Sequence, residues 1–83
     1  MKNFRTYELA LEFYQQCQSV KIKNIVIRNQ FERASLSVVL NVAEGSGKLT
    51  SKDRRRYYAI AMGSFRETQS LLKILKQEQL LKN

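Results

Sequence analysis

A dense group of cations lies in the middle of the sequence. Its members are Lys48, Lys52, Arg54, Arg55 and Arg56, with Asp53 as the acid among them. Cations at this spacing can neutralise several phosphates of a nucleic acid at once, and the backbone N–H groups of a helix N-terminus can assist them. The alternative is a solvated charged surface, whose ion pairs contribute about 0–1 kcal/mol each. We favour a contact with nucleic acid.

The placement of the arginines supports this interpretation. A helix is expected to begin at Thr50 or Ser51, because Thr50 and Asp53 match the capping-box pattern. The N-terminus of a helix already carries roughly half a positive charge, so arginines close to it are unfavourable. A polyanion outside the helix would offset that cost.

Further cations and two aromatic residues surround the group. Tyr57 and Tyr58 follow the arginines directly. Aromatic side chains beside cations can stack on the bases of a single-stranded nucleic acid. Aromatic residues at helical spacing, however, more often belong to a hydrophobic core. Both interpretations stay open at this point. The predicted weaker contacts to nucleic acid are Arg33, Lys21 and Lys23.

Catalysis and metal binding have little support in the sequence. There is no histidine and only one cysteine, Cys17, which we interpret as a small core residue. Glu44 has no recognisable catalytic partner, and we predict that it forms a structural ion pair. The segment 45–48 is not a phosphate loop, because Val42 stands at the first glycine position and Leu49 at the Ser/Thr position. We predict no enzymatic activity, no cofactor and no metal site.

The apolar pattern predicts one all-α domain over residues 1–83, an antiparallel up-down bundle without strands. Its three helices are expected at about 5–19, 25–44 and 51–75. Residues 76–83 either extend the third helix or form a stub of a fourth. Asn24 is the predicted N-cap of the second helix, and Gly45 its C′ residue in the left-handed conformation.

Four small or polar residues are expected to shape the packing. Gly47 belongs with Gly45 to the predicted turn. Asn41 lies in an apolar stretch, where it either caps a neighbouring helix end or fixes the helix register. Gly63 costs about 1 kcal/mol relative to alanine inside a helix. With Ser64 beside it, we predict that a neighbouring helix approaches closely there.

Length and charge narrow the possible partners. The chain of 83 residues has 15 Lys and Arg against 7 Asp and Glu, a formal net charge of +8, which favours acidic partners. A chain this short buries only about 60–65% of its surface on folding, and the helix at 25–44 is apolar on most sides, so we expect a homo-oligomer.

No apolar run approaches the length of about 18 residues that a membrane-spanning helix needs. Glu8 and Glu12 argue against a secretory signal, and we expect a cytoplasmic protein without membrane contact.

Three segments together resemble the four-helix-bundle family that is named after the intervening sequences of large-subunit ribosomal RNA genes. They are Gln30–Val38, Asn41–Lys48 and Ile60–Glu67, in the order and spacing of the family. Tyr7, Ala10 and Tyr14 also match the first helix of the family. The resemblance covers about residues 7–75 and implies an antiparallel helical bundle, ring-like oligomerisation and a non-enzymatic role.

Within that family, the accessory protein of diversity-generating retroelements is similar to this chain. It is a pentameric barrel whose positive surface binds nucleic acid and a reverse transcriptase. The resemblance therefore implies a homo-oligomeric accessory protein that binds the phosphate backbone of RNA or DNA. The alternative is a scaffold protein whose basic surface binds an acidic protein partner such as a reverse transcriptase.

The chain departs from the family pattern at two places. The fourth helix of the family would follow Leu75, where about eight residues remain. Either another chain takes its place in the bundle or the protein is a shortened relative. Arg55 stands where family members often carry an apolar residue, which makes this turn more basic and favours contact with nucleic acid.

Overall fold

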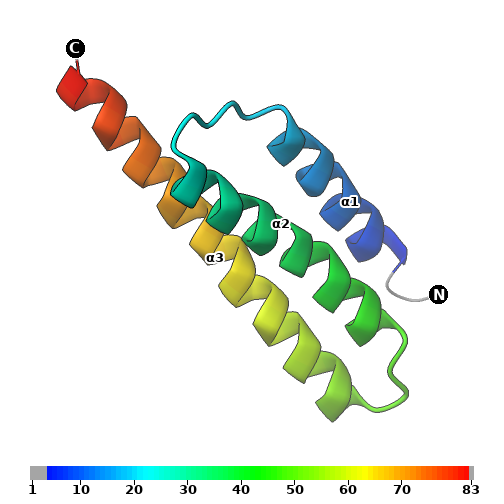
Figure 1. Ribbon diagram of the computed structural model, residues 1–83. Helices are drawn as coiled ribbons and strands as arrows, with labels where there is room; N and C mark the ends of the chain where they lie inside the picture. The colour runs from blue at the N-terminus through cyan, green and yellow to red at the C-terminus, as the bar shows by residue number, and fades with distance from the viewer. Residues whose placement is uncertain (1–3, 83) are drawn as a thin grey trace.

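Three helices fold back on one another in the computed structural model, which describes residues 4–82 (Figure 1). Helix α1 spans Phe4–Gln18, α2 spans Ile25–Ser46 and α3 spans Ser51–Lys82. Successive helices run antiparallel, and α2 lies between α1 and α3 (Figure 1). No strand occurs in residues 4–82. The predicted all-α class and antiparallel helical arrangement are confirmed.

Capping hydrogen bonds confirm both predicted helix starts. Asn24 Oδ1 accepts hydrogen bonds from the backbone N–H groups of Val26 and Ile27, at 3.0 and 3.2 Å. Thr50 Oγ1 accepts one from the backbone N–H of Asp53, at 3.2 Å. These oxygens satisfy amides that have no partner within the first turn of a helix. The starts of α2 and α3 are therefore determined by local sequence.

The end of α2 differs from the prediction. Gly45 lies inside the helix, which continues to Ser46, and no described glycine has a positive φ. Gly47 ends the helix with a φ of −87° and donates its N–H to the carbonyl oxygens of Ala43 and Glu44, at 3.3 and 3.2 Å. The assignment of Gly45 as a left-handed C′ residue was wrong, because right-handed turns continue through it and close the helix without a left-handed residue.

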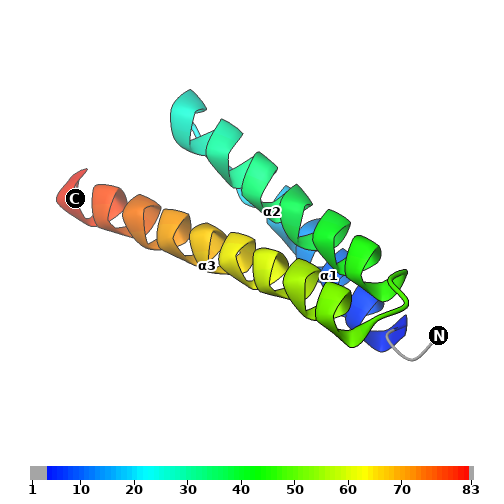
Figure 2. The ribbon, with the colours of Figure 1, turned by 90° about the horizontal axis from the view of Figure 1, so that it is seen from below.

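Helix α3 is longer than predicted. It continues past Leu75 to Lys82, so residues 76–82 extend α3, and the described chain contains no stub of a fourth helix. With 32 residues against the 22 of α2, α3 reaches well beyond the start of α2 (Figure 1). Figure 2 shows α2 and α3 diverging from their shared turn toward the other end of the molecule. The second half of α3 is therefore less covered than its first half.

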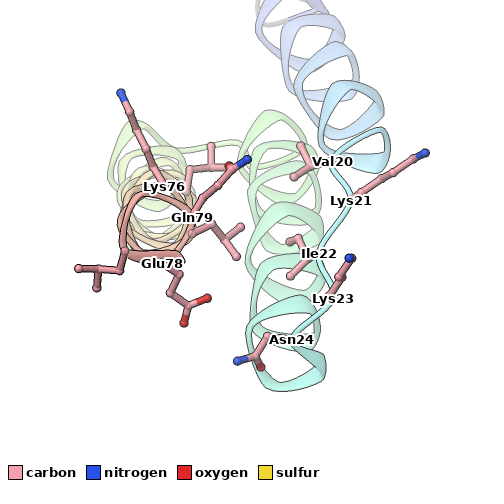
Figure 3. Close-up of a pocket in the computed structure, with 11 residues that line it drawn as sticks. Val20, Lys21, Ile22, Lys23, Asn24, Lys76, Glu78 and Gln79 are labelled. Carbon is pink, nitrogen blue, oxygen red and sulfur yellow. The ribbon is translucent and has the colours of Figure 1, made fainter. Parts of the chain in front are cut away.

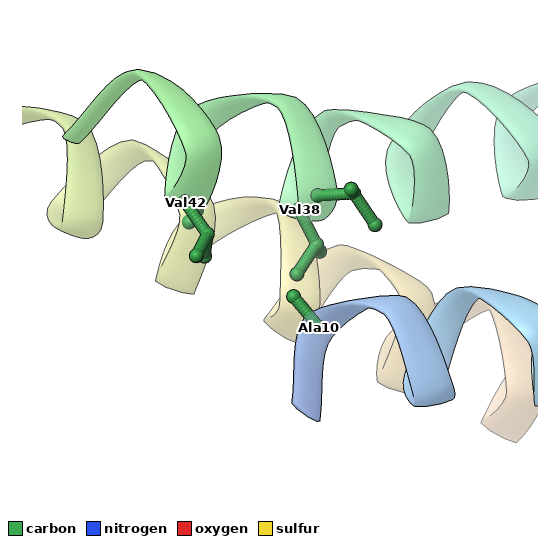
Figure 4. Packing of buried hydrophobic residues seen from close by; sticks show 5 residues of the cluster. Ala10, Val38 and Val42 are labelled. Atoms are coloured by element: carbon green, nitrogen blue, oxygen red, sulfur yellow. The ribbon is translucent and has the colours of Figure 1, made fainter. Parts of the chain in front are cut away.

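Two clusters of buried side chains form the core. The cluster nearer the α2–α3 turn joins all three helices through small residues, with Ala10 facing the valines of α2 in Figure 4. Its members are Ala10, Val38, Val39, Val42 and Ala61. The rings of Phe13 and Phe65, with centroids 5.1 Å apart, add a contact between α1 and α3. Small side chains allow the helices to approach closely at this end.

The second cluster lies toward the α1–α2 linker. Cys17, Ile22 and Phe31 are its buried residues, and Leu71 and Leu75 of α3 pack against them. Burial raises the pKa of the Cys17 thiol, as expected where desolvation disfavours the thiolate. The interpretation of Cys17 as a core residue is confirmed.

Candidate nucleic-acid interface

The basic group lies at one end of the molecule, where α2 turns into α3 (Figure 1). Lys48 belongs to the turn, and the other four cations fall within the first six residues of α3. The positive end of the α3 dipole lies at the same place. Sequence reasoning predicted this concentration correctly, because the cations are neighbours in the chain. We call Lys48, Lys52, Arg54, Arg55 and Arg56 together the basic turn.

Close packing on Gly45 fixes the basic turn against α2. A Cβ atom on Gly45 would lie 2.7 Å from Cε1 and 2.8 Å from Cδ1 of Tyr58, and 3.2 Å from Cβ of Tyr57. Only glycine fits this gap without a shift of its neighbours. In addition, Ser46 Oγ and Tyr58 Oη share a hydrogen bond of 3.1 Å. Tyr58 is thus a packing residue that attaches the start of α3 to the end of α2.

The close helix approach predicted at Gly63 is not found. A Cβ atom there would meet no described atom within 4 Å, and the residue is exposed. The prediction for Gly63 was wrong because the glycine that admits a neighbouring helix is Gly45. The adjacent Ser64 does contact α2, since its Oγ shares a hydrogen bond of 2.7 Å with Ser37 Oγ.

Asn41 bonds within its own helix. Its Nδ2 donates to the backbone carbonyl of Ser37 at 2.9 Å and to Ser37 Oγ at 3.1 Å. Ser37 in turn bonds Ser64 of α3, so a chain of three polar side chains crosses the α2–α3 contact. Asn41 therefore caps no neighbouring helix end, and it supports the Ser37 hydroxyl that faces α3.

Arg54 stabilises the backbone of the turn. Its Nη1 donates to the carbonyl oxygens of Lys48 and Leu49, at 3.1 and 3.3 Å, and its Nη2 donates to Ser51 Oγ at 3.0 Å. These carbonyls follow α2 and precede the first intrahelical acceptor of α3. Arg54 therefore has a structural role that its sequence position did not indicate.

Tyr57 lies beside two cations of the basic turn. Lys48 Nζ and Arg56 Cζ each lie 5.1 Å from the centroid of its ring, within the range of cation–π attraction. Lys48 also forms an ion pair with Glu44, with 3.5 Å between Nζ and Oε2. The predicted structural ion pair of Glu44 is confirmed, with Lys48 as the partner. These contacts restrain Lys48 and Arg56 at the rim of the turn.

Lys52 and Arg55 differ from the other cations of the basic turn. Both side chains are exposed, and neither forms an ion pair or side-chain hydrogen bond with another described residue. Leu49, at the tip of the turn, is 95% exposed. Lys52 and Arg55 are thus the cations of this region that remain available to an external anion without breaking an internal contact.

The three additional cations do not belong to the same region. Lys21 and Lys23 lie in the α1–α2 linker, at the opposite end of the bundle from the basic turn (Figure 1). Arg33 lies in the first half of α2 and donates from Nη2 to Gln30 Oε1. Sequence alone could not separate these cations from the basic turn, because their distance from it depends on the length and direction of each helix.

Metal-ligating clusters and membrane-spanning helices were both sought among the described residues. No group of three or more metal-ligating side chains occurs among them. None of the described helices combines the length and the hydropathy of a membrane-spanning segment. The chemistry that this end of the molecule offers is the binding of an anion by exposed cations and by the N-terminus of α3.

Comparison with known protein families supplies an identification. The model of the 23S rRNA-intervening sequence protein family matches residues 4–83, which is nearly the whole chain. The chain belongs to this family. The resemblance seen in the sequence motifs is thereby confirmed, whereas the likeness to the retroelement accessory protein stays a prediction. Searches of curated proteins and of solved structures return no match.

Proposed function

We propose that this protein is a non-enzymatic nucleic-acid-binding accessory protein that contacts the phosphate backbone through its basic turn. The observation that carries the proposal is the pair Lys52 and Arg55, exposed and without an internal partner in the described chain, on the first turns of α3. The N-terminal backbone amides and positive dipole of α3 add to the attraction of an anion. The family description, which refers to a ribosomal RNA, favours RNA over DNA.

The contacts of the other cations refine this proposal. Arg54 positions the turn, and Lys48 and Arg56 lie against Tyr57. A phosphate that approaches Lys52 and Arg55 therefore finds further cations nearby, which internal contacts hold in place. Binding of this kind depends on phosphates rather than base edges, so we expect little sequence preference.

A double variant with a matched control tests the proposal. Lys52→Ala with Arg55→Ala removes two cations from the basic turn, and Lys21→Ala with Lys23→Ala removes two cations from the opposite end. Fluorescence anisotropy with labelled single- and double-stranded RNA and DNA measures the nucleic-acid affinity of both variants. We expect the first variant to lose about tenfold or more in affinity and the second to lose much less. Equal losses of affinity in the two variants would mean that binding depends on net charge alone. If the wild type bound no nucleic acid, the proposal would be wrong, and an acidic protein would be the favoured partner of the basic turn.

We also propose that the protein self-associates through the outer side of α2. Leu36 and Leu40 lie one turn apart on this helix and are 41% and 54% exposed. A helix that is apolar outside as well as inside favours burial against another chain. Sedimentation velocity of the wild type should show an oligomer that Leu40→Glu dissociates and that Leu49→Glu, at the exposed tip of the turn, does not. A monomeric wild type would contradict this proposal.

A further inference from the structure

Leu49 is exposed at a position where an apolar residue usually packs. It precedes Thr50, the N-cap of α3, and an apolar residue at this position often packs against the fourth residue of the helix. That fourth residue is Arg54 in this chain, and Leu49 is 95% exposed. The leucine therefore does not form the apolar contact that is common at a helix start, and packing within the described chain does not account for it.

Hydrogen bonds hold the backbone on both sides of the Leu49 side chain. Lys48 donates its N–H to the carbonyl oxygen of Gly45 at 3.2 Å. Arg54 Nη1 donates to the carbonyl oxygens of Lys48 and Leu49, at 3.1 and 3.3 Å. The guanidinium thus binds the backbone at Leu49 and leaves the leucine side chain in solvent. A side chain on a held backbone loses less conformational freedom on binding a partner than one on a loose loop.

The surroundings of Leu49 determine which partner fits. The five cations of the basic turn lie at positions 48–56, with Asp53 as the acid among them. The two tyrosines that follow already have contacts, since Tyr58 packs against α2 and the ring of Tyr57 has two cations beside it. A partner that covers Leu49 must therefore offer negative charge and an apolar surface side by side.

We propose that Leu49 packs against the faces of unpaired bases in an RNA whose phosphates are bound by Lys52 and Arg55. Unpaired bases expose their faces, and every base has such a face. The contact therefore adds a preference for unpaired RNA and none for sequence. This inference rests on the proposed function, and it narrows the substrate class to RNA with loops, bulges or single-stranded ends.

Two other partners fit Leu49 less well. In a continuous duplex the base faces are stacked on one another, and an inserted side chain must first separate them, a cost that unpaired bases do not impose. An anionic membrane also combines phosphates with an apolar layer. One leucine, however, has far less apolar surface than a myristoyl chain, which by itself binds a membrane only marginally.

Three labelled RNA probes with the same number of phosphates separate base contact from phosphate contact. The first is a continuous duplex, and the second carries a bulge of unpaired nucleotides. The third carries the same bulge with abasic nucleotides, which keep the phosphates and lack the bases. We expect fluorescence anisotropy to show that the wild type binds the bulged RNA about five- to tenfold more tightly than either of the other two.

Variants of the turn assign this difference to a residue. Leu49→Ala should abolish the preference for the bulged RNA and leave the affinity for the duplex unchanged, because it removes the apolar contact and no phosphate contact. Lys52→Ala with Arg55→Ala should weaken binding of all three probes and keep the preference. Circular dichroism checks that each variant stays helical.

The opposite end of α3 supplies a matched control. Leu81 is 85% exposed and lines an open groove between α3 and the α1–α2 linker. Cations lie there too, with Lys21 and Lys23 on the linker and Lys76 on α3 (Figure 3). Leu81→Ala thus removes the same side chain from another basic surface, and it should change the affinity for none of the three probes.

The possible failures are distinguishable. If the wild type binds all three probes equally, the inference is wrong and the proposed function stands, whereas no binding of any probe overturns both. An equal loss for all three probes in Leu49→Ala would show that the leucine does not act on bases. Vesicles of phosphatidylcholine and phosphatidylserine supply the last comparison. Vesicle binding that Leu49→Ala abolishes, without a preference for bulged RNA, would assign the leucine to a membrane instead.

Discussion

The two ends of α3 are surrounded very differently. At its start, Thr50 caps the helix, Arg54 binds the carbonyls of the turn, and Tyr58 packs against Gly45. At the other end, no described residue beyond Thr68 is buried, and Leu81 is almost fully exposed. One helix therefore passes from a closely packed turn to an open end, residues 72–82, which the other described residues cover little.

This difference separates a part of α3 that many contacts hold from a part that few contacts hold. Hydrogen bonds of Arg54 and the close contact at Gly45 hold the backbone of the turn, and Lys52 and Arg55 extend from it without an internal partner among the described residues. The open end, in contrast, exposes apolar side chains such as Leu72 and Leu81 and has few internal contacts. The following predictions examine whether this contrast is correct, beginning with the largest expected effect.

Phe31 should dominate the stability of the open end. It is 2% exposed and is the largest member of the cluster that supports Leu71 and Leu75 of α3. Replacement by alanine should cost about 3–5 kcal/mol in the free energy of unfolding, because it leaves a cavity in the core. Urea denaturation followed by circular dichroism measures this loss, with Leu81→Ala as a control that should change little. A loss below about 1 kcal/mol would mean that this cluster is not a true core.

The two helical glycines should respond to alanine with opposite sign. At Gly45 an added Cβ clashes with Tyr58, and overpacking of this kind costs about 1–3 kcal/mol, more than the helix propensity gained. At Gly63 the Cβ meets open space, so alanine should stabilise the protein by about 0.5–1 kcal/mol. Thermal and urea unfolding of both variants provide the comparison. Stabilisation by Gly45→Ala would contradict the close packing of the turn.

Arg54 and Arg55 should separate into a structural and a binding residue. Arg54→Ala removes hydrogen bonds to two carbonyls and a hydroxyl and should destabilise the protein by about 1 kcal/mol. Arg55→Ala removes no internal contact and should leave stability unchanged while it weakens nucleic-acid binding. Urea unfolding and anisotropy on the same two proteins make this comparison. The division of roles fails if Arg55→Ala is the more destabilising of the two.

Amide hydrogen exchange should follow the burial along α3. Amides in residues 72–82 should exchange faster than those in residues 57–68, because few buried side chains hold that part of the helix. Uniform protection along α3 would show that the open end is already stabilised in another way.

Local sequence was sufficient to predict part of this structure. The starts of α2 and α3 depend on Asn24 and Thr50, whose side chains bond amides two or three residues away. The basic turn is likewise contiguous in the chain. The ion pair of Glu44 with Lys48 spans a single helical turn, so it too was accessible to sequence reasoning.

Contacts between helices could not be predicted in the same way. Whether Gly45 or Gly63 faces a neighbouring helix depends on the rotation of α3 against α2, and the sequence motifs favoured the wrong glycine. The structural role of Arg54 depends on the path of the turn. The separation of Lys21 and Lys23 from the basic turn depends on the direction of α2.

The salt dependence of RNA binding tests the central claim most directly. If the basic turn neutralises phosphates, the logarithm of the binding constant should fall with the logarithm of salt concentration with a slope of several units. Lys52→Ala with Arg55→Ala should reduce that slope by about 2, one for each lost phosphate contact. A slope that this variant does not change, or no binding at low salt, would contradict the assignment of the basic turn as a nucleic-acid interface.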